Sequence, residues 1–137
     1  MTERTFVMIK PDGVKKGLTD EIASRIRESN LKIIEMKQME LDRETAEELY
    51  SVHEGKEFFE KLVKHVTAGP VIPMLVEGDN AIKRMREIIG ATNPEEAEEG
   101  TIRADFGSDI TNNIIHSADS PESFKREARI FFSEDQI

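Results

Sequence analysis

The segment NIIHSADSPESF, from Asn113 to Phe124, contains the end of a predicted strand and the start of a predicted helix. Two isoleucines lie directly before His116. Ser120 followed by Pro121 is typical of a helix start, because the hydroxyl caps the first turn and proline tolerates the first helical position. We therefore predict a strand over residues 111–116 and a helix from Pro121 onward. The imidazole of His116 would then lie beside the free N–H groups of a helix N-terminus, which favour a negative charge.

The same kinds of pattern predict the rest of the fold. Further strands are expected over residues 5–10, 31–41 and 71–76. Further helices are expected over residues 20–29, 42–50, 58–66 and 80–89. Thr19, Asp42 and Asp79 are the expected N-caps, and Gly90 follows the last of these helices. Pro73 predicts an interruption or an edge position for the third strand.

This order of elements, with two βαβ-like units and four strands, predicts an α+β domain of the broad α/β class. We expect the ferredoxin-like split βαβ arrangement, a four-stranded antiparallel sheet with helices packed on one face. A small flavodoxin-like parallel sheet is the alternative. At 137 residues the chain is the size of one domain, spanning 1–137. Residues 91–110 show no clear period, and so long a loop is expected to serve function.

Composition narrows the possible functions. The chain has no cysteine, which excludes disulfides, thiolate nucleophiles and cysteine-based zinc sites, and leaves the histidines at 53, 65 and 116 as candidates. A formal net charge of −9 argues against nonspecific binding to nucleic acids or anionic membranes, which requires a basic surface. No apolar run is long enough to span a membrane and no secretion signal is evident, so we expect a cytoplasmic protein.

His116 is the strongest candidate for catalysis. Most single histidines only form hydrogen bonds, but strand alternation would place Ile114 and His116 on one face and Asn113 and Ile115 on the other, with the imidazole near the strand end. Glu127 follows on the last helix and could hold one ring nitrogen while the other attacks a substrate. From spacing alone, a solvated position for Glu127 is the simpler interpretation.

Cations and hydroxyls suited to phosphate are scattered along the chain. Lys10 ends the first strand before the turn at residues 11–13, Arg86 lies on the fourth helix, and Arg103 shares the long loop with Thr92. Arginine forks and hydroxyls match the geometry of phosphate oxygens. Taken singly, each arginine of an acidic protein is more often a surface ion-pair partner.

The aromatic residues have ordinary structural explanations on sequence alone. Phe58 belongs to an apolar helix stripe, and Tyr50, the only tyrosine, ends a helix. Core packing is the commoner role for both, and stacking of a base on Phe58 is the minority interpretation. No Gly-rich Walker loop is present, which argues against a P-loop kinase.

Five stretches taken together resemble the nucleoside diphosphate kinase family, over about residues 5–132. They are RTFVMIKPDGV at 4–14, GPV at 69–71, GATNP at 90–94, GTIRADF at 100–106 and NIIHSADS at 113–120. The resemblance implies ping-pong transfer of the γ-phosphoryl group from a nucleoside triphosphate to a diphosphate, with Mg²⁺ on the nucleotide phosphates. Substrates would include ATP, GTP and their deoxy forms. It also implies the ferredoxin-like fold and a homo-oligomer, hexamer or tetramer, with no membrane or specific nucleic-acid partner.

The resemblance also implies roles for individual residues. His116 would become phosphohistidine, Glu127 would hydrogen-bond its ring, and Tyr50 would lie close by. Lys10 and Asn113 would contact the ribose and neighbouring phosphate oxygens. The other expected contacts are with the phosphates (Arg86, Thr92 and Arg103) and with the two faces of the base (Phe58 and Ile110). Because stacking does not read the edge of a base, broad base specificity is expected.

One position departs from the family pattern. The family usually has His-Gly-Ser-Asp where this chain has His116, Ser117, Ala118 and Asp119, so the hydroxyl two residues after the histidine is missing. If that hydroxyl assists the transferring phosphate, its loss costs about 1.5–3 kcal/mol, or a roughly ten- to hundredfold slower reaction. A nucleotide-binding or regulatory relative with weakened chemistry is the alternative function.

Overall fold

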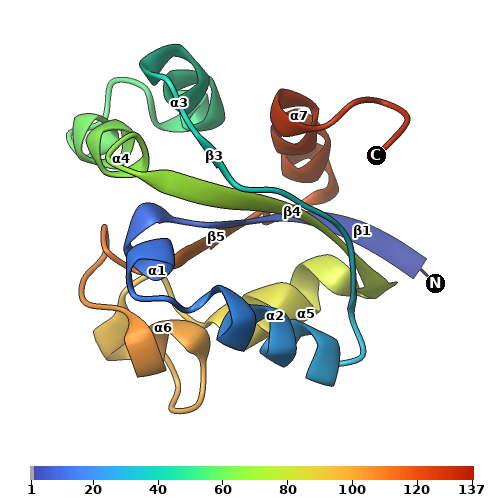
Figure 1. The fold of residues 1–137 in the computed structure, drawn as a ribbon. Coiled ribbons are helices and arrows are strands. Elements are labelled where there is room, and N and C mark those ends of the chain that lie inside the picture. The colour runs from blue at the N-terminus through green and yellow to red at the C-terminus, as the bar shows by residue number, and fades with distance from the viewer. Residues whose placement is uncertain (1) are drawn as a thin grey trace.

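The computed structural model describes residues 2–137 and contains an antiparallel sheet between two layers of helices (Figure 1). The strands are β1 (Thr2–Ile9), β2 (Lys32–Met36), β3 (Met39–Glu40), β4 (Pro70–Asp79) and β5 (Ile115–Ser117). Their order is β2-β4-β1-β5, with β3 also paired to β4, and these pairs are all antiparallel. The ferredoxin-like prediction is confirmed, and the flavodoxin-like alternative is wrong.

The sheet has five strands rather than the predicted four, because residues 31–41 form two short strands. Both pair with β4, which is central and continuous through Pro73, so the predicted interruption or edge position is wrong. The N–H of Lys37 donates to the carbonyl of Pro73 at 3.2 Å. Because the N–H and C=O of a strand residue point to the same side, the missing N–H of Pro73 faces the gap between β2 and β3.

Helices cover both faces of the sheet. They are α1 (Pro11–Lys15), α2 (Thr19–Glu28), α3 (Arg43–Leu49), α4 (Phe59–Val66), α5 (Ala81–Ile89), α6 (Ile102–Phe106) and α7 (Pro121–Phe131), with short 3₁₀ helices η1 (Ser51–His53) and η2 (Pro94–Glu96). α3, α4 and α7 lie on one side, and α1, α2, α5 and α6 lie on the other (Figure 1). The prediction of helices on one face is wrong. Residues 6–9 of β1 are all fully buried, and a strand that is apolar at every position needs cover on both sides.

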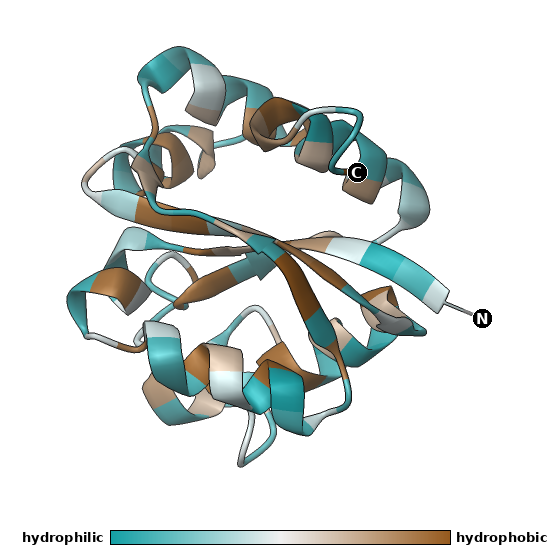
Figure 2. Cartoon of the chain, turned by 45° about the vertical axis from the view of Figure 1, so that its right-hand side comes forward, coloured by the Kyte–Doolittle hydropathy of each residue, from teal (hydrophilic) through white to brown (hydrophobic). Residues whose placement is uncertain are grey.

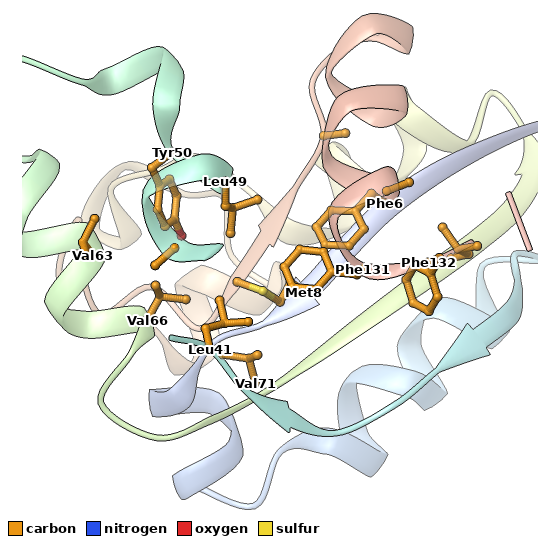
Figure 3. Packing of buried hydrophobic residues seen from close by; sticks show 14 residues of the cluster. Phe6, Met8, Leu41, Leu49, Tyr50, Val63, Val66, Val71, Phe131 and Phe132 are labelled. Atoms are coloured by element: carbon orange, nitrogen blue, oxygen red, sulfur yellow. The ribbon is translucent and has the colours of Figure 1, made fainter. Parts of the chain in front are cut away.

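Two hydrophobic clusters, one on each face of the sheet, hold the layers together. Hydrophobic residues concentrate on the strands and on the sides of the helices that face them (Figure 2). The cluster beneath α3, α4 and α7 includes Phe6, Tyr50 and Phe131 (Figure 3). The rings of Phe6 and Phe131 stack with their centroids 5.1 Å apart. This contact fixes α7 against β1, and β1 in turn pairs with the strand that carries His116.

Two of the predicted helix starts are confirmed. Asp42 accepts a hydrogen bond from the N–H of Thr45 at 2.8 Å and caps α3. Ser120 accepts one from the N–H of Ser123 at 3.1 Å, with Pro121 as the first residue of α7. The side chain and the backbone group are three residues apart in both cases, so a local pattern was enough to predict them.

The other two predicted N-caps are wrong. Thr19 is the first residue of α2 and not its cap. α5 begins after Asn80, which has a left-handed φ of 53°, and not after Asp79. The N–H of Ile82 in the first turn donates instead to Oε1 of Glu3 at 3.0 Å. Glu3 lies on β1, far away in sequence, so no local pattern could have revealed it.

Residues 91–110 contain more helix than their lack of a period predicts. They include η2 and α6, which are capped by the side chains of Asn93 and Thr101. Gly90 ends α5 as predicted, with a φ of 91°, and a Cβ at this position would approach Oγ1 of Thr101 to 2.5 Å. Helices of three and five residues are too short to produce an apolar period.

β5 covers residues 115–117 and not the predicted 111–116. Ile114 interrupts the strand with a φ of 76°, a conformation that β-branched residues rarely adopt. Ile114 and Ile115 are therefore both buried in the same cluster, and the predicted alternation of faces is wrong here. His116 still lies on β5, which is an edge strand of the described sheet, and side chains from both helical layers can meet there.

Candidate active site

The ring of His116 is held by Glu127 of α7. Nε2 of His116 lies 2.7 Å from Oε1 of Glu127, whose side chain is buried. Because a carboxylate accepts a hydrogen bond from a ring N–H, we assign the proton to Nε2 and a free lone pair to Nδ1. The solvated position that spacing favoured for Glu127 is wrong, since the packing of α7 on the sheet turns this side chain inward.

Arg126 is a residue of this site that the sequence did not predict. Its Nη2 donates to Oε2 of Glu127 at 3.2 Å, and its Nη1 donates to the carbonyls of Glu48 and Leu49 at 3.2 Å each. Arg126 thereby joins α7 to the C-terminal end of α3, where a cation is favourable. The position of Arg126 next to Glu127 in the sequence did not indicate this role, because the bonds to α3 depend on how two helices that are far apart in the sequence pack together.

Two aromatic rings lie near His116. The ring of Tyr50 is nearly perpendicular to the imidazole, at 82° with centroids 6.0 Å apart, and the ring of Phe6 lies at 6.1 Å. Burial, together with the charge of Glu127, raises the pKa of the Tyr50 phenol. The hydroxyl therefore stays protonated at neutral pH.

Lys10 and Asn113 form a buried polar pair. Nζ of Lys10 donates to Oδ1 of Asn113 at 2.8 Å and to the carbonyl of Thr111 at 2.7 Å. The amide nitrogen of Asn113 donates to the carbonyls of Thr92 at 3.0 Å and Ile110 at 3.1 Å. Burial lowers the pKa of the Lys10 ammonium to about 8. These bonds bring together four of the residues predicted for the site, from three separate parts of the chain.

Arg103 holds the backbone around β5. Its guanidinium donates to the carbonyls of Asn113 at 3.3 Å, Ile115 at 2.7 Å and Gly90 at 3.1 Å. A guanidinium has five N–H donors, so three are used here and two remain for an anion. Burial and the nearby charge of Arg86 lower the pKa of Arg103 to about 10, which leaves it charged at neutral pH.

These groups surround a cavity of about 400 Å³. Nine of the ten predicted site residues line it: Lys10, Tyr50, Phe58, Arg86, Thr92, Arg103, Ile110, Asn113 and His116. The tenth, Glu127, is not in the lining and holds the ring of His116 through Nε2. Phe58 and Ile110 are 40% and 59% exposed, which leaves apolar surface available for a ligand.

Six further residues line the cavity without having been predicted: His53, Leu62, Thr111, Ile115, Ser117 and Asp119. The ring of His53 lies 5.1 Å from Phe58 and 6.4 Å from Tyr50. Burial and neighbouring positive charges lower the pKa of His53. Helical spacing could have found two of the six, because His53 lies three residues after Tyr50 and Leu62 lies four residues after Phe58.

Ala118 does not line the cavity. It is fully buried in the cluster that contains Phe6, and its N–H donates to the carbonyl of Phe6 at 2.9 Å. The hydroxyl that does line the cavity belongs to Ser117. The side chain of Ala118 is therefore set back from the cavity surface, and the slower reaction predicted from the missing hydroxyl stays a prediction.

Comparison with known proteins gives one consistent result. A model of the family described as nucleoside diphosphate kinase matches residues 3–137. Among curated proteins, the nucleoside diphosphate kinase of Archaeoglobus fulgidus is 53% identical over 98% of this chain and 89% of its own. That of Hyperthermus butylicus is 56% identical over 98% of this chain and 95% of its own.

Solved structures agree with the sequence comparisons. The nucleoside diphosphate kinase of Aquifex aeolicus has a TM-score of 0.96 at 41% identity, covering 100% of this chain and 99% of that one. The halophilic nucleoside diphosphate kinase of Halobacterium salinarum, in complex with CDP, has a TM-score of 0.95 at 43% identity, covering 99% and 91%. By sequence and by fold, this chain belongs to the nucleoside diphosphate kinase family.

Proposed function

We propose that this chain transfers the γ-phosphoryl group of a nucleoside triphosphate to a nucleoside diphosphate through a phosphohistidine at His116. One observation carries this proposal. Nε2 of His116 is occupied by buried Glu127 at 2.7 Å, so Nδ1 is the ring nitrogen with a free lone pair. The cations Lys10, Arg86 and Arg103 line the same cavity, which suits attack on a polyphosphate.

The reaction has two balanced steps. In the first, the lone pair on Nδ1 of His116 attacks the γ-phosphorus, the bond to the bridging β–γ oxygen breaks, and the diphosphate leaves. In the second, a terminal β-phosphate oxygen of another diphosphate attacks the same phosphorus and the N–P bond breaks. Phosphoryl transfer depends on positioning and charge neutralisation, which Arg86, Arg103 and Lys10 supply. Glu127 keeps the ring oriented through both steps.

The lining of the cavity supports broad base specificity. We propose that the base stacks on the exposed apolar surfaces of Phe58 and Ile110, which do not read its hydrogen-bonding edge. Lys10 and Asn113 are then placed for the sugar and the neighbouring phosphates, with Thr92 and the arginines along the phosphate chain. ATP, GTP and their deoxy forms are the proposed substrates. The CDP complex of the halobacterial relative supports nucleotide binding by this fold.

Kinases of this family require a divalent cation, which we propose is Mg²⁺ carried by the nucleotide phosphates. Within residues 2–137 no group of three or more histidine or acidic side chains could hold a metal ion. Asp119 is the one carboxylate among the described residues that line the cavity. This donor set fits an ion that is bound mainly by phosphate oxygens. When bound, the ion neutralises charge on the transferring group.

Labelling with ATP tests the proposed function directly. Protein incubated with ATP that is radiolabelled on its γ-phosphate is expected to become an acid-labile phosphoprotein. Addition of unlabelled GDP is then expected to discharge the label into GTP. A protein that binds nucleotides but takes up no label would instead support the alternative, a regulatory relative with weakened chemistry.

Two neighbouring variants test which hydroxyl matters for transfer. Ser117→Ala is expected to lower kcat/KM about tenfold, because a hydrogen bond to a charged phosphate is lost. Ala118→Ser places a hydroxyl in the buried cluster, so kcat/KM is expected to change less than about threefold while the free energy of unfolding falls by about 1–2 kcal/mol. Steady-state kinetics and urea unfolding measure both effects. A gain of tenfold or more from Ala118→Ser would mean that this position does reach the phosphate.

Lys10 makes nucleotide affinity depend on pH. Burial lowers the pKa of its ammonium to about 8, so the free protein loses this charge as the pH rises from 7 to 9. Phosphate favours the charged form, so the affinity for ADP is expected to be about tenfold lower at pH 9 than at pH 7. The pKa of Lys10 in the folded protein lies below its ordinary value of 10.5, so deprotonation above pH 8 stabilises the fold. Unfolding therefore does not explain the loss of ADP affinity at high pH.

Isothermal titration calorimetry between pH 7 and 9 measures this dependence. Lys10→Met is the control, and it is expected to bind ADP weakly and equally across the range. An equal decline in the variant would assign the pH dependence to another group.

We also propose a homo-oligomer, hexamer or tetramer, and a cytoplasmic location. Met36 on the edge strand β2 is 46% exposed, which supports contact with another copy. A light-scattering mass distinguishes the two assemblies. Within residues 2–137, no helix combines the length and apolar character needed to cross a membrane.

A further inference from the structure

The backbone next to the candidate nucleophile is strained. Ile114 has a φ of 76°, and for a β-branched residue this conformation persists only where the surroundings impose it. It lies directly after Asn113 and two residues before His116. If Ile114 relaxed, both of these side chains would move relative to the cavity.

The N-cap residue of α1 and its first turn together bond both backbone groups of Ile114. Oδ2 of Asp12 accepts a hydrogen bond from the N–H of Ile114 at 3.0 Å, and the N–H of Lys10 donates to its carbonyl at 2.8 Å. The contact is close, since a Cβ on Gly13 would lie only 3.0 Å from the carbonyl oxygen of Ile114. α1 therefore packs directly against the strained residue Ile114.

Asp12 is in turn held from the opposite layer. Its other oxygen, Oδ1, lies 3.0 Å from Nε2 of His65 in the last turn of α4, and the two side chains are only 10% and 13% exposed. α1 and α4 lie on opposite sides of the sheet but at the same end (Figure 1). Burial raises the pKa of Asp12, but the bond and charge of His65, the charge of Lys10 and the N–H of Ile114 outweigh it, so the net direction is down.

We infer that Asp12, oriented by His65, is a positioning residue for phosphoryl transfer. It holds Ile114 in its strained conformation and thereby sets the places of Asn113 and His116. Neither Asp12 nor His65 lines the 400 Å³ cavity, so the effect acts through the backbone and not through contact with substrate. This inference rests on the proposed function.

Asp12→Ala removes both bonds and is expected to lower kcat roughly 10- to 100-fold, because a small displacement of the nucleophile is costly to in-line transfer. The dissociation constant for ADP is expected to rise by a smaller factor than kcat falls, because Asn113 is displaced and Lys10 loses the nearby charge of Asp12, whereas the stacking residues and Arg86 are untouched. Asp12→Asn still accepts the N–H of Ile114 and is expected to restore kcat to within about threefold of the unmodified protein. Hydrogen exchange at the Ile114 amide, measured by NMR, is expected to be faster in the alanine variant only.

Asp42→Ala is the matched control. Asp42 also accepts a backbone N–H, that of Thr45 at 2.8 Å, but it caps α3 far from Ile114. Because Asp42 is exposed, this variant is expected to lose some stability, less than Asp12→Ala, with no change in kcat. If Asp12→Ala also loses stability and leaves kcat unchanged, the positioning role is wrong and Asp12 is only structural.

Two further measurements keep the test decisive. If Asp12→Ala does not fold, His65→Phe removes only the orienting partner, and an unchanged kcat in that variant would overturn the inference. If the unmodified protein shows no phosphoryl exchange, the proposed function fails, while protection of the Ile114 amide by Asp12 is still tested by hydrogen exchange.

Discussion

Replacing His116 by glutamine is expected to lower phosphoryl exchange between ATP and GDP by at least about 10⁴-fold, because the variant lacks the nucleophile. A glutamine amide is a poor nucleophile at neutral pH. Its N–H can still reach Oε1 of Glu127, so the surroundings of the ring are disturbed little. Initial rates of GTP formation, followed by chromatography over several hours, cover the required range.

The control for His116→Gln is nucleotide binding. The affinity for ADP is expected to stay within about threefold of that of the unmodified protein, because Lys10, Phe58 and Arg103 are unchanged. The variant is also expected to take up no label from γ-labelled ATP. Exchange at an undiminished rate in this variant would rule out the phosphohistidine mechanism.

Replacing Arg103 by methionine is expected to lower kcat/KM by about 10²–10³-fold, the second largest effect. Arg103 combines two roles. Its bonds to the carbonyls of Asn113 and Ile115 hold the backbone beside His116, and its two remaining N–H groups are available to the transferring phosphate. Methionine is similar in length but supplies neither. Both kcat and the KM for ATP are expected to change, which steady-state kinetics resolve.

Two variants complete the Arg103 experiment. Arg103→Lys keeps the charge but not the planar fork, so only part of the activity is expected to return. Arg25→Met is the matched control, since Arg25 forms ion pairs with Glu21 and Asp105 at 2.8 Å each and does not line the cavity. It is expected to cost some stability and leave kcat/KM unchanged. Equal kinetics for Arg103→Met and Arg25→Met would contradict the role of Arg103.

Predictions from the sequence held where a residue acts on its near neighbours. Ser120 caps α7 and Asp42 caps α3 because the side chain and the N–H that it accepts are three residues apart. Gly90 ends α5 with a conformation that disfavours side chains. Predictions were wrong where the partner is distant. The first turn of α5 uses Glu3 of β1, and the missing N–H of Pro73 faces a gap between two other strands.

The residues of the candidate site likewise divide into those that the sequence indicated and those that only the structure revealed. Motif resemblance placed ten residues in it, nine of which line one cavity while Glu127 holds the histidine. The resemblance did not reveal Arg126, which joins α7 to α3, or the pair of Asp12 and His65 behind Ile114. These residues act through other residues of the protein and not through the cavity, so a pattern of substrate contacts omits them.

By itself, the sequence determined that His116 lies on a strand, that a capped helix follows it and that cations suited to phosphate are present. Only the tertiary structure decided which imidazole nitrogen is free, how Arg103 divides its donors and why Ile114 keeps its strained conformation. The physical reason is the distance along the chain over which each interaction acts. Backbone preferences and apolar periods act over a few residues, whereas a hydrogen bond such as that between Asp12 and Ile114 exists only after packing brings distant segments within 3.0 Å.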